Sequence, residues 1–170
     1  TYRELLEDVT LHPAMGVYLS MVKNQKPNEL LGFRPDENYA REIMQLFSIG
    51  LEMLEADGTT MLDGNGDPIP TYDQDVIKGM AHAFTGWNFA GTEASNIWEW
   101  LGAWPELGPM EAWEDYHDSE AKTLVTWYAA PAGQTAEQEL ELVLDLLDAH
   151  PNVGPFIGKQ LIQRLVTSNP

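Results

Sequence analysis

The stretch PDENYAREIMQLFSIGL, residues 35–51, decides the fold. Its apolar residues recur every three or four positions, which places them on one face of an α-helix. This face continues slightly beyond the stretch and comprises Ala40, Ile43, Met44, Phe47, Leu51 and Leu54. Asp36 stands directly before the pattern, where its side chain can accept hydrogen bonds from the first free N–H groups. The sequence therefore predicts a long helix from Asp36 to about residue 55.

The same spacing predicts helices on both sides of this one. The opening residues 1–10 read as the last turns of a helix, and Thr135 with Gln138 forms a capping-box pattern before another. The remaining expected helices are 13–22, from Asp73 to about 87, from Thr135 to about 147, and from Pro151 or Pro155 to 166. We therefore predict an all-α fold with a helical core, over a single region covering 1–170.

Two connections between the expected helices are long and differ in composition from the helices. Residues 57–72 are rich in Gly, Asp and Pro, which favours turns and a small hairpin. Residues 88–134 show no sustained periodicity and contain five of the six tryptophans. We expect this segment to be a long, acidic, Trp-rich loop, and loops of that length are usually functional or mobile.

Composition limits the classes of function. The chain has 170 residues, with 27 acidic against 9 basic side chains, a net charge of −18 and no cysteine. The absence of cysteine excludes disulfides and thiolate metal sites. The negative charge argues against nucleic acid as a partner, because phosphate binding needs clustered Lys and Arg. No apolar run approaches the roughly 18 residues of a membrane span.

Several sequence blocks resemble one known family. Besides 35–51, they are LHPAMGVYLS (11–20), TYDQDVIKGMAHAFTGW (71–87), HDSEAKTL (117–124) and HPNVGPFIGKQLIQRLVTSNP (150–170). Together they resemble the bacterial domain-of-unknown-function 1800 family of large, mostly exported helical proteins. Position 82 departs from the family pattern, which often has Arg where this chain has His82.

The resemblance carries implications about setting and partners. It implies an extracytoplasmic protein, periplasmic or secreted, and the strong acidity suits such a saline medium. It also implies that 1–170 is an internal fragment, so the remainder of the full-length chain would be one partner. An exported neighbour resembling the sulfatase and alkaline-phosphatase fold would be another, in a polysaccharide-related setting. This last implication rests on fold and neighbourhood alone.

Five polar residues form the candidate catalytic set. Asn38, Arg41 and Glu42 follow one side of the helix motif, and His117 with Asp118 closes the Trp-rich loop. In this hypothesis Glu42 and Asp118 act as acid, base or ligand, and Arg41 holds an anionic group. The alternative is that Arg41 and its carboxylate partners only clamp loops onto the core, because a buried charge must be paired.

A divalent metal is a second hypothesis for the same polar groups. Without cysteine, the ligands would have to be nitrogen and oxygen atoms, and the candidates are His12, Glu42, His117, Asp118 and His150. The alternative for the two histidines that precede prolines is a helix cap or loop anchor. The run DGNGDP (63–68) begins like a calcium loop but has Pro where Gly is needed, so we expect an ordinary Asx turn.

The tryptophans suggest a third kind of site. Trp98, Trp100, Trp104 and Trp113 alternate with acidic residues, which suits stacking on sugar rings or a contact with a partner protein. The alternative is a lid whose tryptophans are buried on the helices. The sequence thus leaves three functions open: an enzyme-like scaffold with a polar or metal centre, a binding module for a glycan or partner protein, and a purely structural helical domain.

Overall fold

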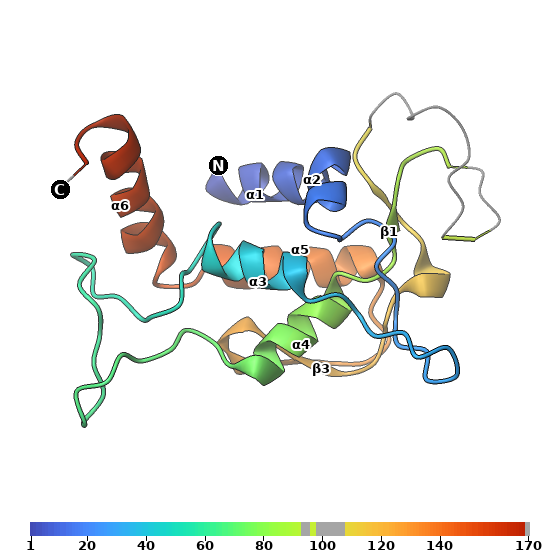
Figure 1. Ribbon diagram of the computed structural model, residues 1–170, viewed down its shortest axis with the longest axis horizontal. Coiled ribbons are helices and arrows are strands. Elements are labelled where there is room, and N and C mark those ends of the chain that lie inside the picture. The colour runs from blue at the N-terminus through green and yellow to red at the C-terminus, as the bar shows by residue number, and fades with distance from the viewer. Residues whose placement is uncertain (93–95, 98–107, 169–170) are drawn as a thin grey trace.

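The computed structural model describes residues 1–92, 96–97 and 108–168, and these ranges contain six α-helices (Figure 1). They are α1 (Tyr2–Leu11), α2 (Pro13–Tyr18), α3 (Asn38–Gln45), α4 (Gln74–Ala83), α5 (Ala136–Asp148) and α6 (Val153–Leu165). None of these helices is long and apolar enough to cross a membrane.

The prediction of an all-α fold is wrong, because the described residues also contain two small antiparallel sheets. Strand β1 (Trp87–Asn88) pairs with β2 (Glu111–Ala112), and β3 (Lys122–Leu124) pairs with β4 (Tyr128–Ala130). Two short 3-10 helices, η1 (Glu114–Tyr116) and η2 (Val125–Trp127), separate these strands. The protein is therefore a mixed fold with substantial helix content.

Both sheets lie within or at the border of the segment 88–134 that we expected to be a loop. Its strands are two or three residues long, and a period-two alternation cannot show in so short a run. The first sheet brings Trp87 opposite Ala112, so both ends of the intervening segment return to the same place. The second sheet lies directly on α4, as Figure 1 shows.

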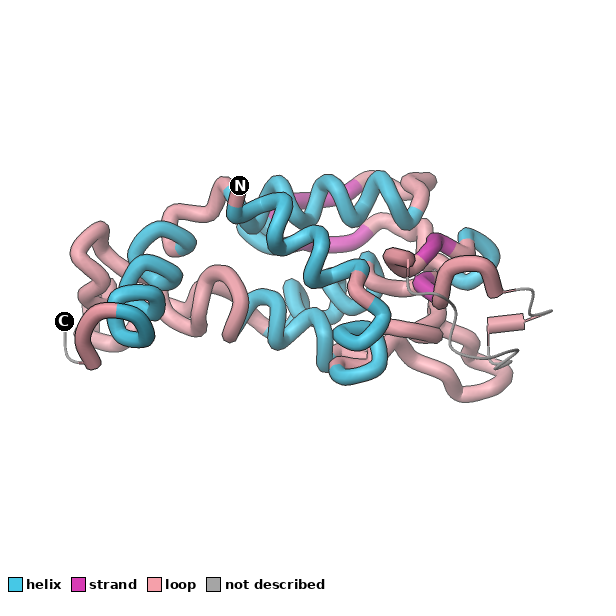
Figure 2. Tube along the Cα trace, turned by 90° about the horizontal axis from the view of Figure 1, so that it is seen from above, coloured by secondary structure: helices cyan, strands magenta, loops and turns pink. Residues whose placement is uncertain are grey.

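Helix α4 is at the centre of the core and contacts α3, α5 and β3. Its apolar stripe was predicted correctly, and Val76, Met80 and Phe84 are fully buried. α1 packs on α5, and Figure 2 shows these two helices running side by side along the molecule. Burial of this kind stabilises by about 25 cal/mol per Å² of apolar surface, so the packing of α4 against these three elements contributes to the stability of the fold.

Helix α3 ends ten residues before the predicted limit. Ser48 Oγ donates to the carbonyl of Ile43 at 2.5 Å, and Gly50 adopts φ +72° while its N–H donates to the carbonyl of Met44. These are the hydrogen bonds of a glycine-terminated helix end. The start is closer to expectation: Asp36 accepts a hydrogen bond from the N–H of Asn38, although Glu37 is the capping residue.

The residues after α3 form turns joined by antiparallel bridges. The bridges pair Leu54 with Thr60, Leu62 with Pro68, and Glu52 with Pro70. In the turn at 63–67, the carboxylate of Asp63 accepts hydrogen bonds from the N–H groups of Asn65 and Asp67, as expected for an Asx turn. We call residues 52–70 the bridged segment.

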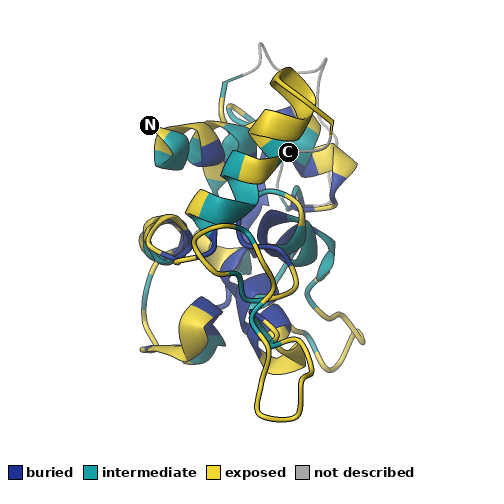
Figure 3. Ribbon diagram, turned by 90° about the vertical axis from the view of Figure 1, so that its left-hand side faces the viewer, coloured by how far each residue is buried: buried dark blue, intermediate teal, exposed yellow. Residues whose placement is uncertain are grey.

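Helix α6 lies with the bridged segment at one end of the molecule. Figure 2 shows both on the side opposite the β1–β2 sheet. No residue of α6 is fully buried, and Figure 3 shows this helix in the colours of exposed and intermediate residues. Its link to the body is Asn152, whose amide donates to the carbonyls of Ile49 and Glu52.

Candidate functional site

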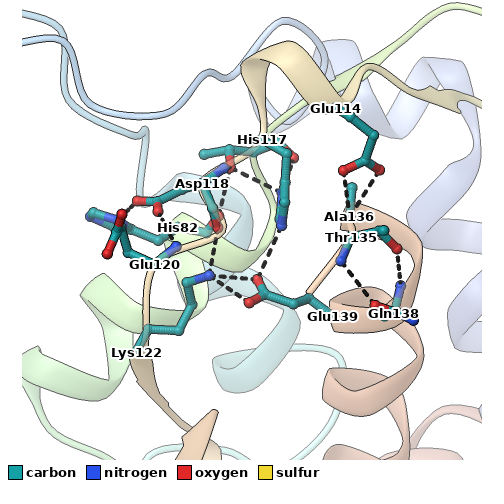
Figure 4. Close-up of polar contacts among 11 residues, drawn as sticks. His82, Glu114, His117, Asp118, Glu120, Lys122, Thr135, Ala136, Gln138 and Glu139 are labelled. Atoms are coloured by element: carbon teal, nitrogen blue, oxygen red, sulfur yellow. Dashed lines mark hydrogen bonds and ion pairs between the residues drawn. The ribbon is translucent and has the colours of Figure 1, made fainter. Parts of the chain in front are cut away.

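Five charged or titratable side chains meet between α4, α5 and the segment that leads into β3. They are His82, His117, Asp118, Lys122 and Glu139, which we call the charge cluster (Figure 4). Four of these side chains are at least 94 % buried, and only His82 is appreciably exposed, at 31 %. Buried charges must be paired, and here they are paired with one another.

The strongest pair of the cluster is Lys122 with Glu139. The ammonium of Lys122 donates to both carboxylate oxygens at 2.6 and 2.7 Å, and to the carbonyl of Asp118 at 2.6 Å. Glu139 projects from the buried face of α5, so this contact ties β3 to α5. Charge-assisted hydrogen bonds of this length are about twice as strong as neutral ones.

His117 lies deeper than the other histidine of the cluster. Its Nδ1 donates to the carbonyl of Thr85 at 3.0 Å, which fixes the hydrogen on that nitrogen. Its Nε2 faces the carboxylate of Glu139 at 3.4 Å and has no hydrogen-bond partner among the described residues. The ring therefore fills the space between the end of α4 and α5.

His82 and Asp118 form the partly exposed edge of the cluster. Nδ1 of His82 is hydrogen-bonded to Oδ2 of Asp118, while Oδ1 accepts a hydrogen bond from the N–H of Glu120 at 2.9 Å. Burial alone would raise the pKa of Asp118. The hydrogen bonds from His82 and Glu120 and the positive charges of His82 and Lys122 lower that pKa to about 2. Asp118 is therefore a carboxylate at neutral pH and holds the imidazole of His82 in one orientation.

Two glycines, one in α4 and one just after it, allow the segment from His117 to β3 to lie close against this helix. A Cβ at Gly79 would lie 1.7 Å from the carbonyl oxygen of Thr123, so β3 crosses α4 where no side chain exists. Gly86 has φ +85°, and a Cβ there would lie 2.9 Å from the backbone N of His117. Both close approaches require glycine. Thr85 adds a bridge, because its hydroxyl donates to the carbonyl of His82 and accepts from the N–H of Asp118.

The family model described as "Protein of unknown function (DUF1800)" matches residues 1–170. The chain belongs to this family. The resemblance inferred from the sequence blocks is therefore confirmed. No curated protein and no solved structure matches the chain.

The structure of this DUF1800 chain separates the predicted catalytic residues into two groups. His117 and Asp118 belong to the charge cluster. Arg41 instead donates to Glu37 at 2.6 Å and to Gln74 at 3.2 Å, in an exposed contact between the starts of α3 and α4. Its neighbours in the motif, Asn38 and Glu42, lie on the same helix, and within the described part of the chain none of the three forms a hydrogen bond or ion pair with the charge cluster.

The histidines that precede prolines anchor backbone turns. Nδ1 of His12 accepts a hydrogen bond from the N–H of Ala14 at the start of α2. Nδ1 of His150, which is buried, accepts one from the N–H of Asn152 at 3.1 Å. In the described part of the chain, no three His, Asp or Glu side chains converge so that they could hold a metal ion. In this DUF1800 chain His12 lies between α1 and α2, Glu42 lies on α3, and His150 lies between α5 and α6.

The predicted tryptophan site falls mostly outside the described residues. Trp98, Trp100 and Trp104 are in the part of the chain that the structure does not describe. Trp113 is half-buried, and its ring lies 6.1 Å from that of Tyr116 at an angle of 44°. This position favours a packing role for Trp113.

Three residues of the charge cluster were missing from the predicted catalytic set: His82, Lys122 and Glu139. Two of them had a detectable signal. Glu139 occurs on the apolar stripe of α5 with Leu140, Val143 and Leu147, and an acid on a buried face requires a buried partner. Lys122 is the only cation between Lys78 and Lys159 and follows His117 and Asp118 closely. His82 had no such signal, because it lies beside the apolar stripe of α4 and not on it.

Proposed function

We propose that this DUF1800 chain is an enzyme-like scaffold in which the His82–Asp118 pair transfers protons. The observation that carries the proposal is the position of His82, whose ring is 31 % exposed above a buried, ionised carboxylate. A catalytic base needs a fixed ring, one free nitrogen and access for the substrate.

The pair has the orientation that proton transfer requires. Asp118 accepts from Nδ1, so the acceptor nitrogen of a neutral His82 is Nε2. No described residue hydrogen-bonds to Nε2. That atom is therefore free to take a proton from a water or a hydroxyl group and to return it to a leaving group. Hydrolysis of an ester, glycoside or phosphate is the reaction class that such a pair serves.

We also propose that this activity takes place outside the cytoplasm. The family resemblance and the net charge of −18 support an extracytoplasmic location near polysaccharide, with the rest of a longer chain and an exported sulfatase-like protein as partners. These partners would approach surfaces outside the charge cluster, because the cluster is buried on all sides except at His82.

A second candidate function is structural. The four buried members of the cluster are paired within it, which is what a latch between β3, α4 and α5 requires. The family's frequent Arg at position 82 would preserve the ion pair with Asp118 but could not act as a base near neutral pH. The substitution His82→Arg therefore separates the two functions.

The test compares wild type with His82→Arg, His82→Gln and Asp118→Asn. Turnover of 4-nitrophenyl esters, glycosides and phosphates is measured together with urea unfolding. We expect wild type to hydrolyse one class and all three variants to be at least 100-fold slower, the usual contribution of a general base. His82→Arg is expected to keep wild-type stability, because it keeps the ion pair.

The opposite pattern would contradict the proposal. If wild type is no faster than His82→Gln on any of the three classes, while His82→Arg unfolds like wild type, the pair is a latch. The tautomer offers an independent check by ¹⁵N NMR. Proton transfer requires that Nδ1 of His82 carries the hydrogen in wild type and loses this preference in Asp118→Asn.

A further inference from the structure

An exposed tryptophan lies at the end of α4 opposite to His82. The indole Nε1 of Trp127 donates to Oδ2 of Asp73 at 3.2 Å, and the other oxygen of Asp73 caps α4. Trp127 is nevertheless 54 % exposed. One edge of the ring is therefore fixed to the helix start while much of its surface stays open to solvent.

The backbone at this tryptophan is strained. Thr126 has φ +59° and Trp127 has φ +54°, in the left-handed region that favours glycine. A β-branched residue and a bulky aromatic rarely adopt this conformation. Both residues belong to the turn that joins β3 to β4, and tight hairpin turns favour positive φ at their central positions. The turn leaves both side chains exposed.

The chemistry around the indole favours an uncharged, hydroxylated ligand. The acidic residues Asp73 and Asp75 are exposed at the start of α4, and Tyr128 is 42 % exposed. Carboxylates and amides bind hydroxyl groups, and an indole face packs against the C–H face of a pyranose ring. The same carboxylates repel sulfated or uronic sugars.

We propose that Trp127 is the stacking platform of a binding site for a neutral hexose ring of a polysaccharide. Polar groups at the start of α4 contact the hydroxyls of the bound ring. This site is distinct from the tryptophans at 98–113 that the sequence suggested. It rests on the exposure of the indole, on its place in the β3–β4 turn and on its hydrogen bond to Asp73.

The platform and the His82–Asp118 pair lie toward opposite ends of α4. Asp75, Lys78 and His82 are three and four residues apart, so they share one exposed stripe of α4. The helix spans about 13 Å from the Asp73 end to His82, the length of a short oligosaccharide. A glycan held at Trp127 would extend toward His82, and this extension rests on the proposed function, whereas binding at Trp127 does not.

Binding is tested by the indole ¹⁵N–¹H signals of the full chain. The probes are maltohexaose, cellohexaose, laminarihexaose and mannohexaose, with hexagalacturonate as the acidic comparison. Trp127→Ala assigns the signal and removes the platform. Thr126→Gly is the matched control, because glycine accepts φ +59° and leaves the indole in place, so it should bind equally and unfold at a higher urea concentration.

The expected result is a shift of the Trp127 signal with at least one neutral hexasaccharide. Trp127→Ala should weaken its binding at least tenfold, and Thr126→Gly should not. No shift with any neutral probe at 10 mM, or equal binding of hexagalacturonate, would overturn the proposal. Since His82→Gln leaves this signal untouched, a failure of glycan binding and a failure of the acid–base proposal are seen separately.

Discussion

Gly79 is the residue whose replacement the structure forbids most clearly. Its α-carbon faces the carbonyl of Thr123 so closely that a methyl group would overlap the oxygen. We expect Gly79→Ala to destabilise the protein by about 3 kcal/mol or more, measured by urea unfolding, because backbone on both sides must move. Gly158→Ala in α6 is the control, since nothing lies within 4 Å there. Equal stability of the two variants would contradict the close packing of β3 on α4.

The buried pair of Lys122 and Glu139 allows a double-mutant cycle. Removal of either partner leaves an unpaired buried charge, so Lys122→Met and Glu139→Leu should each cost about 3–5 kcal/mol. The double variant should recover much of this loss, because two apolar side chains can occupy the same space. Urea unfolding of the four proteins measures the coupling. Additive losses would show that the pair contributes nothing as a pair.

At the scale of residues, the sequence predicted part of the site. The adjacent His117 and Asp118 were found because a His beside an Asp is recognisable in one dimension. Arg41 was predicted to belong to the same site but lies outside the charge cluster. Helical spacing shows which residues share a face of a helix, but not which face meets another element. The contact of His82 with Asp118 joins residues 36 positions apart, and only the tertiary packing of β3 on α4 creates it.

Among the elements, the connection from η1 to β3 depends most on pH. The pKa of Asp118 is lowered from the ordinary 3.8 to about 2. The folded state therefore prefers the carboxylate, and this stabilisation is complete above about pH 5 and is lost as pH falls through 2. A shift of this size in a side chain only 6 % exposed corresponds to roughly 2 kcal/mol.

Urea unfolding at pH 5 and at pH 3 measures this dependence. We expect wild type to lose more stability between the two values than Asp118→Asn, which has no proton to gain at this position. The variant should be the less stable protein at pH 5 and nearly equal to wild type at pH 2. The same pH slope in both proteins would mean that other carboxylates control acid unfolding.

The elements also show why the fold was only partly predictable. The starts of α4 and α5 were correct, because Asp73 and Thr135 satisfy the first free N–H groups of a helix by purely local contacts. The predicted end of α3 was wrong. Leu51 and Leu54 continue the helical spacing in the sequence, whereas the hydrogen bonds of Ser48 and Gly50 end the helix before them. The two sheets were missed because their strands are only two or three residues long, too short to show an alternating pattern.

For the whole molecule, the electrostatics are determined mainly by the large excess of acidic over basic side chains. With 27 acidic and 9 basic residues, most carboxylates cannot have a cationic partner. The main surface exception is Arg3, which contacts Glu7, Glu141 and Asp145 and so joins α1 to α5. Repulsion among the unpaired carboxylates opposes the compact state at low salt.

Added salt should therefore stabilise the folded protein. The Debye length falls from about 10 Å at 0.1 M to about 3 Å at 1 M, so repulsion between surface carboxylates is screened while the buried Lys122–Glu139 pair is not. Urea unfolding at 0.1 M and 1 M salt should show a gain on the order of 1 kcal/mol. NaCl and KCl should act equally if screening is the cause, and an effect of one cation alone would indicate bound ions. A loss of stability with both salts would mean that attractive surface pairs such as those of Arg3 outweigh the repulsion, although the net charge is −18.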